Sequence, residues 1–413
     1  MRRVLVVGAG VAGLLTVQAL LDRAAALASA PPDITLLAHR HGHGTASRSG
    51  GLSLPYASTD GRVARWTARS TEIVLSGAHR PAVGHTRQAR ALLVSRRGPV
   101  SSPVSSPASG PASGPVSGPV GGPVGEEVDP AALGLPGYPY GLRAAPSPQW
   151  DTCRLLLTWP DRLEQEHGVR VVDLPQRLTS TVDLTALHDR HGADVTVACL
   201  GLGAYVLGDT RLHGRLGVLL QGPVPRGTVH VEGAVIDDDD ALRPRYTVPH
   251  RSTVPHRSTV PHRGNGSDRG SGSGGSGSED AGSDDHLHVG GTYLPVDDPA
   301  DWDDPSRLAA TALAEVPSLL ADVRDRFPAL AGWVPTVDPW WGIRPVRDTV
   351  ALGRVDPDLV GGRDVVVSHG WGGSGWTIGP AVAEEIARSL LPGSGAGSGP
   401  ETDPLLAYGW WRP

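Results

Sequence analysis

The chain has 413 residues, a formal net charge of −6 at pH 7 and a sequence pI of about 6.2. This length supports a large core and two domains, and the lack of an extended basic patch argues against a nucleic-acid partner. No segment is apolar over the length that a membrane span needs. The two cysteines lack metal-ligand spacing and fit a reducing compartment, so we expect a cytoplasmic protein without a bound metal.

The N-terminal segment carries a dinucleotide-binding fingerprint. An apolar run over residues 4–7 predicts a strand buried on both faces, and the pattern G-x-G-x-x-G follows at once in Gly8, Gly10 and Gly13. A helix is predicted after these glycines, and residues 34–37 predict a second strand. In this order the three glycines permit a tight turn, close approach of a pyrophosphate, and close packing of helix on strand.

The end of the second predicted strand departs from the usual fingerprint. An acidic residue commonly meets the ribose hydroxyls there, but this sequence has His39 and Arg40. Two interpretations stay open: these residues contact the adenosine ribose or a phosphate, or they are solvated basic residues at a strand end. The departure bears on how a cofactor is held and leaves the predicted fold unchanged.

Two segments near the C-terminus indicate a ligand site. In residues 342–347 (Gly-Ile-Arg-Pro-Val-Arg), Arg344 offers a guanidinium beside a rigid proline, which suits a two-pronged grip on a carboxylate. Residues 369–377 form a glycine-rich loop directly before a predicted helix, where backbone N–H groups converge on negative or electron-rich ligand atoms. We expect the two ends of the chain to build one site together.

Two low-complexity inserts interrupt the chain. Proline recurs at every fourth position from Pro99 to Pro123, and a Ser-Thr-Val-Pro-His-Arg repeat near residue 248 leads into a Gly/Ser/Asp-rich stretch that ends at Asp285. Neither insert can bury enough apolar surface to offset chain entropy. The repeated histidines fix no coordination geometry, and the four aspartates at 237–240 are interpreted as a solvated turn rather than a metal site.

The middle of the chain mixes two kinds of element. Residues 193–203 predict a buried parallel strand with Cys199 in the core, whereas residues 229–232 and 287–292 predict strands of a different, antiparallel sheet. Residues 307–323 have the spacing of an amphipathic helix. The chain is therefore expected to enter and leave the nucleotide-binding part more than once.

Five segments, considered together, point to a known family. They are residues 6–14, Ser49–Leu52 with Pro55 and Tyr56, residues 193–201, residues 342–347 and residues 372–377. In order and spacing they resemble the D-amino-acid oxidase family of FAD-dependent amine and amino-acid oxidoreductases. The resemblance implies FAD as cofactor and an α/β fold, in which a doubly wound, Rossmann-like FAD-binding domain carries a second, mixed or antiparallel-sheet substrate domain.

The resemblance also implies roles for single residues. Arg344 matches the arginine that pairs with the substrate carboxylate, and Tyr246 resembles a substrate-binding tyrosine that follows a proline. The implied reaction is hydride transfer from an amino acid or amine, in the first instance a D-amino acid, to the flavin, with molecular oxygen as acceptor. The residues expected to hold the cofactor are Gly8, Gly10, Val11, Ala12, Gly13, His39, Arg40, Thr45, Ser47, Gly51, Leu52, Gly201, Gly372, Gly373, Ser374, Gly375, Trp376 and Thr377.

The domain organisation follows from the same comparison of motifs. We expect an FAD-binding domain from residues 1–57, 151–211 and 346–395, a substrate domain from residues 58–150 and 212–345, flexible inserts at 98–125 and 248–286, and a tail at 396–413. No membrane or nucleic-acid partner is expected, and a homodimer is compatible with the sequence.

One departure keeps other functions open. A second family tyrosine, four residues before Tyr246, falls on Leu242. A flavin-dependent dehydrogenase or desaturase that acts on a biosynthetic, carrier-bound substrate therefore stays an alternative, as does a flavin-binding protein without turnover. Peroxide release with free amino acids separates the first alternative from an oxidase.

Overall fold

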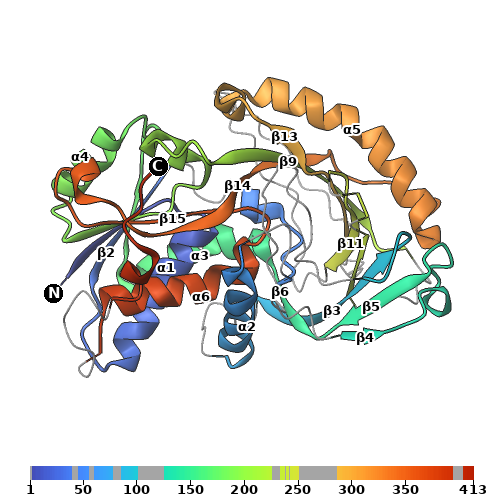
Figure 1. The fold of residues 1–413 in the computed structure, drawn as a ribbon, viewed down its shortest axis with the longest axis horizontal. Helices are drawn as coiled ribbons and strands as arrows, with labels where there is room; N and C mark the ends of the chain where they lie inside the picture. The colour runs from blue at the N-terminus through green and yellow to red at the C-terminus, as the bar shows by residue number, and fades with distance from the viewer. Residues whose placement is uncertain are drawn as a thin grey trace, which may run out of the picture.

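The computed structural model describes residues 2–39, 45–54, 60–77, 85–100, 125–225, 233–237, 239–240, 242–250, 286–393 and 403–413. One mixed sheet runs through these residues, parallel at one end and mainly antiparallel at the other (Figure 1). Helices cover both ends. This architecture confirms the predicted α/β fold with a Rossmann-like part and an antiparallel part.

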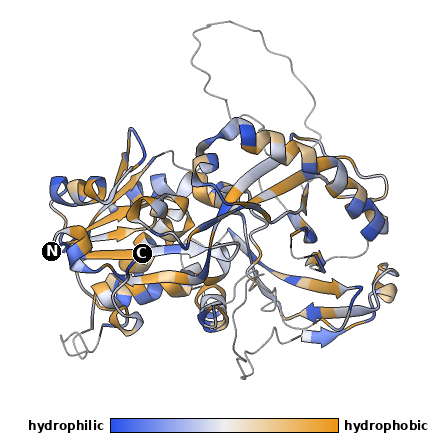
Figure 2. Cartoon of the chain, turned by 45° about the horizontal axis from the view of Figure 1, so that its top comes forward, coloured by the Kyte–Doolittle hydropathy of each residue, from blue (hydrophilic) through white to orange (hydrophobic). Residues whose placement is uncertain are grey.

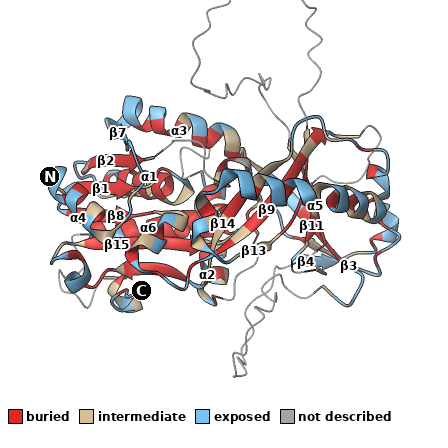
Figure 3. Cartoon of the chain, turned by 90° about the horizontal axis from the view of Figure 1, so that it is seen from above, coloured by how far each residue is buried: buried red, intermediate tan, exposed pale blue. Residues whose placement is uncertain are grey.

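The N-terminal apolar run lies at the centre of the parallel region. The strands of this region are, in spatial order, β7 (Arg170–Asp173), β2 (Asp33–Ala38), β1 (Arg3–Val7), β8 (Val195–Ala198) and β15 (Val365–Trp371). Residues 4–7 of β1 and all residues of β8 are buried (Figure 3). Burial on both faces explains why the sequence of these strands is continuously apolar instead of alternating.

Helices pack on both faces of the parallel strands. The helices α1 (Val11–Ala26), α3 (Thr152–His167) and α6 (Gly375–Leu390) share a core with Val4 and Val6. The helix α4 (Thr181–Arg190) packs instead with Leu5 and Val7, on the opposite face. The helices divide between the two faces in this way because successive side chains of a strand point to opposite faces of the sheet. Helix α2 (Arg62–Leu75) lies against α6. Among the described residues, no helix is both long and apolar enough to cross a membrane.

The second region is a mainly antiparallel part of the sheet, covered by α5 (Pro305–Arg326). Apolar residues of α5, including Leu308 and Leu319, pack with β-strand residues in a separate core, and polar and apolar residues alternate along this helix (Figure 2). Its strands are β3 (Thr86–Ser95), β4 (Gly125–Glu127), β5 (Tyr140–Ala144), β6 (Ser147–Trp150), β9 (His213–Pro223), β10 (Gly233–Asp237), β11 (Arg245–His250), β12 (His286–Gly290) and β13 (Leu294–Val296).

A long strand, β14 (Trp340–Arg354), joins the two regions. Its first half pairs with β9, and its second half pairs with β15, on the other side of a bulge between Val346 and Ala351. The complete strand order is β4-β5-β3-β10-β11-β12-β9-β14-β15-β8-β1-β2-β7, with β13 on β9 and β6 on β3. The domain boundary expected between residues 345 and 346 falls inside this continuous strand.

Three buried ionisable side chains lie at the bulge of β14. One oxygen of the Asp209 carboxylate is 2.9 Å from Nε of Arg347 and 2.6 Å from Nε2 of His369 on β15. Burial alone raises the pKa of Asp209, but its hydrogen bond to His369 and the charge of Arg347 outweigh that effect and keep the pKa below its ordinary value. Burial lowers the pKa of His369, so the neutral imidazole donates to the carboxylate.

Some sequence-based expectations differ from the structure, and others fall on residues that the structure does not describe. The strand expected at residues 229–232 and most of both inserts lie outside the described residues. The interpretation of the aspartate run as a solvated turn is wrong for Asp237, because this side chain is buried and accepts hydrogen bonds from Tyr138 and Arg326. Within the described ranges, no group of His, Cys, Asp and Glu side chains is arranged to bind a metal ion.

Replacing the buried carboxylate tests its contribution to the fold. We expect Asp209→Asn to lower the free energy of unfolding by about 3–5 kcal/mol at pH 7, because Arg347 would be left buried without a counter-charge. Since folding lowers the pKa of Asp209, this stability is present above its ordinary pKa of 3.8 and is lost as the pH falls through the lower folded value. Urea unfolding at several pH values measures the loss.

A surface ion pair provides the control for this substitution. Asp189 pairs with Arg363 on the protein surface, where solvent screening leaves little net stabilisation. Asp189→Asn should therefore leave the unfolding midpoint almost unchanged. An equal loss for both variants would contradict a special role for Asp209.

Candidate active site

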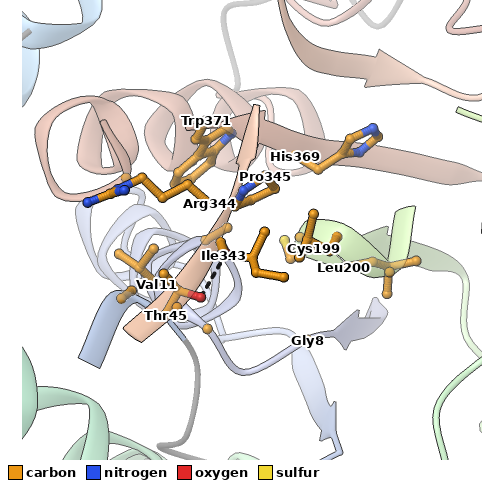
Figure 4. A pocket seen from close by; sticks show the side chains of 18 of the residues that line it. Gly8, Val11, Thr45, Cys199, Leu200, Ile343, Arg344, Pro345, His369 and Trp371 are labelled. Atoms are coloured by element: carbon orange, nitrogen blue, oxygen red, sulfur yellow. Dashed lines mark hydrogen bonds between the residues drawn. The ribbon is translucent and has the colours of Figure 1, made fainter. Parts of the chain in front are cut away.

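A cavity of about 780 Å³ lies where the parallel and antiparallel regions meet. Its walls come from both ends of the chain, namely the β1–α1 turn, the first half of β14 and the β15–α6 loop, and from the end of β8 in the middle. Figure 4 shows Ile343 between Cys199 on one side and the Arg344 side chain on the other. The expectation that the two termini build one site therefore agrees with the position of the cavity.

The three glycines at the β1–α1 junction have different structural roles. Gly8 has φ +111°, and a Cβ there would lie 2.2 Å from the carbonyl oxygen of Cys199. A Cβ on Gly13 would lie 1.7 Å from the carbonyl oxygen of Gly8. Both positions thus exclude any side chain for reasons of packing. Gly10 is different, because no atom lies within 4 Å of a Cβ placed there and the residue borders the cavity.

Two helices begin at the wall of the cavity without a side-chain cap. Gly10 precedes α1 and Ser374 precedes α6, and neither helix start has a hydrogen bond from a capping side chain. The first N–H groups of a helix need acceptors and create a positive potential. Open space above Gly10, together with two helix starts of this kind, fits a ligand with a pyrophosphate and an electron-rich ring. The residues present therefore suit a flavin dinucleotide.

The β15–α6 loop lies directly beside the strand that carries Arg344. The N–H of Gly372 donates to the carbonyl oxygen of Pro345 at 2.7 Å. Gly370 has φ +77°, and a Cβ there would lie 2.8 Å from Cδ of Arg347. The loop can approach β14 this closely only because glycine occupies position 370. The same contact fixes the distance between Arg344 and the glycine-rich loop.

The side chains of Arg344 and Tyr246 pack over glycines of neighbouring strands. In the sheet, Gly342 of β14 is opposite Gly217 of β9, and Gly290 of β12 is opposite Tyr246 of β11. A Cβ on Gly217 would lie 2.2 Å from Nη1 of Arg344, and a Cβ on Gly290 would lie 2.3 Å from Cζ of Tyr246. The glycines thus leave room for two long side chains that converge on one face of the sheet.

The charge in this part of the cavity is positive. Among the described residues that line the cavity none is Asp or Glu, whereas the arginines 177 and 344 are present. Burial raises the pKa of Tyr246, and the Arg344 guanidinium opposes this rise through its charge and a hydrogen bond. Burial also raises the pKa of Cys199 to about 12, so its thiol is a neutral wall residue. The site is suited to bind an anionic group.

The predicted site residues fall into two groups. Those that line the cavity are Gly8, Gly10, Val11, Ala12, His39, Thr45, Gly201, Tyr246, Arg344, Gly372, Gly373, Gly375 and Trp376. The imidazole of His39 lies 3.1 Å from the carbonyl oxygen of Leu174. Thr45 donates to the carbonyl oxygen of Ile343 at 2.8 Å, which connects the segment after β2 to β14 (Figure 4).

The other predicted residues lie behind the wall. Thr377 donates to the carbonyl oxygen of Leu54, and Gly51 (φ +65°) packs against the carbonyl of Trp150. These contacts hold the segment after β2 against α6 and β6. The remaining members of this group are Gly13, Ser47, Leu52 and Ser374, and Arg40 lies outside the described residues.

Sequence patterns did not indicate several residues at the cavity. Arg177 follows β7, Tyr205 belongs to the short helix after β8, and Trp340 begins β14. Trp340 leans over Gly342, since a Cβ on that glycine would lie 2.7 Å from its Cη2 atom. The two tryptophans at 340–341, directly before Gly-Ile-Arg-Pro, were the sequence signal that could have indicated Trp340. No sequence pattern indicated Arg177, because only the fold brings it to the cavity.

Comparison with known proteins agrees with this geometry. The model of the FAD-dependent oxidoreductase family (DAO) matches residues 3–389. The chain therefore belongs to this family, its cofactor is FAD, and it is an enzyme that catalyses oxidation and reduction. No curated protein matches the sequence.

Solved structures show the same fold at low sequence identity. Glycine oxidase from Geobacillus kaustophilus is 14% identical with a TM-score of 0.61, and the match covers 94% of each chain. L-proline dehydrogenase from P. horikoshii is 14% identical with a TM-score of 0.59, over 100% of this chain and 99% of the other. Iminodiacetate oxidase from Chelativorans sp. BNC1 is 15% identical with a TM-score of 0.57, over 95% and 96%.

Two glycine substitutions separate cofactor binding from folding. A Cβ at position 10 has no protein atom within 4 Å, and the backbone conformation there is allowed for a side chain (φ −78°, ψ −173°). We therefore expect Gly10→Val to fold normally but to lose most of its FAD, as measured by flavin absorbance per protein. Gly13→Val should lower the free energy of unfolding by about 3 kcal/mol, because its Cβ overlaps the Gly8 carbonyl. Full FAD occupancy in Gly10→Val would contradict the assignment of this cavity.

Proposed function

We propose that the protein oxidises the Cα–N bond of an amino acid, in the first instance a D-amino acid, to the imine, with molecular oxygen as electron acceptor. The observation that carries the proposal is Arg344. Among the described residues its partners are the carbonyl oxygen of Thr292, at 2.9 Å, and the tyrosines 246 and 293, and none is a carboxylate. A guanidinium that borders a cavity without an acidic partner suits a substrate carboxylate.

The proposed roles follow from the positions of the side chains. Arg344 binds the carboxylate in two-pronged fashion, and the neutral hydroxyl of Tyr246 provides a further donor beside it. Bound FAD supplies the hydride acceptor. Holding the carboxylate fixes the direction of the Cα–H bond, and alignment of this kind lowers a barrier by several kcal/mol without any ionised catalytic base.

The glycine-rich loop has a different proposed role. The N–H groups at the start of α6, near Gly373 and Gly375, would face the cofactor and stabilise negative charge on it. Gly8, Gly10 and the start of α1 would hold the pyrophosphate, and His39 would lie at the adenosine end. We also propose the division into an FAD-binding domain and a substrate domain on the segments stated above, with β14 continuous across their junction.

A second candidate function has one observation in its favour. Leu242 stands where a second substrate-binding tyrosine was expected, and it is 47% exposed. Without that tyrosine the site has one contact fewer for a small free amino acid. This favours a dehydrogenase or desaturase that acts on a larger, carrier-bound substrate and passes its electrons to another acceptor. The two candidates differ in the electron acceptor and in the size of the substrate.

Removal of the guanidinium tests its role. We expect Arg344→Ala to keep bound FAD but to lose about 100-fold or more in kcat/KM for carboxylate substrates, because a charge-assisted, two-pronged contact is lost. Arg170→Ala is the matched control, since Arg170 lies on the surface at the far edge of the parallel strands. Wild-type turnover in Arg344→Ala would remove the basis of the proposal.

The acceptor is tested with a substrate panel. Purified holoenzyme should release hydrogen peroxide with one or more free D-amino acids, in amounts equal to the imine-derived keto acid. Flavin that is bleached by an amino acid under anaerobic conditions, but reoxidises slowly in air, would favour the dehydrogenase. Flavin that no amine or amino acid reduces would contradict both candidates.

A further inference from the structure

A short segment after β12 lies behind Arg344 and is fixed from several sides. The N–H of Gly291 donates to the carbonyl of Pro244, and the N–H of Tyr293 donates to the carbonyl of Leu242, both at 2.8 Å. Thr292 bridges the main chain of β9, because its hydroxyl donates to the carbonyl of Leu216 and accepts from the N–H of Val218, both at 3.0 Å. The segment is therefore a rigid support.

This support is itself tied to α5. The guanidinium of Arg245 is fully buried, donates to the carbonyl of Gly291 at 2.7 Å and pairs with Asp322 of α5. The segment is thus held by β9, by the residues just before β11 and, through Arg245, by α5. Any group that rests on it is held before a substrate arrives.

Arg344 rests on this segment through two contacts. Its Nη1 donates to the carbonyl of Thr292 at 2.9 Å, and its Cζ lies 5.6 Å from the centre of the Tyr293 ring. A guanidinium at this distance from an aromatic face is attracted by the ring. Burial raises the pKa of Tyr293, and the charge of Arg344 opposes the rise. Arg344 lines the cavity, and Tyr293 is not among the lining residues.

We propose that Tyr293 is a positioning residue for the substrate carboxylate, whose aromatic ring holds the Arg344 guanidinium in its binding geometry. The proposal rests on the proposed function of Arg344. The hydroxyl of Tyr293 is buried and has no hydrogen-bond partner, so the ring and not the hydroxyl performs this role. An arginine without a carboxylate partner would otherwise sample several rotamers, and the ordering of its side chain would weaken binding.

The test compares two ligands of the same shape in the holoenzyme. Benzoate carries a carboxylate, benzamide does not, and the change in flavin absorbance on titration gives each dissociation constant. We expect Tyr293→Leu and Tyr293→Met to weaken benzoate about tenfold, the loss of one partly buried cation–π contact, and to leave benzamide binding and FAD content unchanged. Tyr293→Phe, which keeps the ring, should bind benzoate within about twofold of wild type.

The control and the contrary outcomes are distinct. Tyr140→Leu removes an exposed tyrosine of β5 and should change neither dissociation constant. Unchanged benzoate binding in both Tyr293→Leu and Tyr293→Met would overturn the proposal, as would a loss in Tyr293→Phe as large as that in Tyr293→Leu. Wild-type enzyme that prefers benzamide to benzoate would instead overturn the proposed function of Arg344, and the role of Tyr293 with it.

Discussion

The buried carboxylate of Asp209 is the constraint on which the site depends. It holds Arg347 on β14 and His369 on β15 at the point where the two strands lose their regular register. Four residues of β14, 347–350, face a single residue of β15 in this bulge. Desolvated charges keep their position only when they are paired, so Asp209 fixes how β14 crosses from one region to the other. Arg344 and the β15–α6 loop are placed by that crossing.

Glycines let main chains and side chains approach one another closely in this protein. At Gly8, Gly13 and Gly370 the neighbouring atoms leave no room for a Cβ. At Gly217 and Gly290 the room is taken by the Arg344 guanidinium and the Tyr246 ring. Gly10 alone among these faces open space at the cavity. At the β1–α1 turn the wall of the cavity is therefore mainly backbone.

Sequence reasoning found the local elements and missed the long-range contacts. The strand–glycine–helix unit that begins with residues 4–7, the helix at 307–323 (observed at 305–326) and the glycine-rich entry to α6 were predicted, because hydrophobic period and turn chemistry act over a few residues. The burial of Asp237, the pairing of Asp209 and the arrival of Arg177 at the cavity were not. Each depends on partners many residues away, and no local pattern indicates the strand register that brings these partners together.

The arginine of the site illustrates why long-range support is needed. In the proposed function Arg344 binds the substrate carboxylate, and a carboxylate partner from the protein would compete with that substrate. The protein must therefore hold Arg344 with neutral groups, and the Thr292 carbonyl and the Tyr293 ring are such groups. Neutral contacts are weaker than an ion pair, so they can position the side chain only if they are themselves rigid. The bonds that tie residues 291–293 to β9, to the start of β11 and, through Arg245, to α5 supply that rigidity.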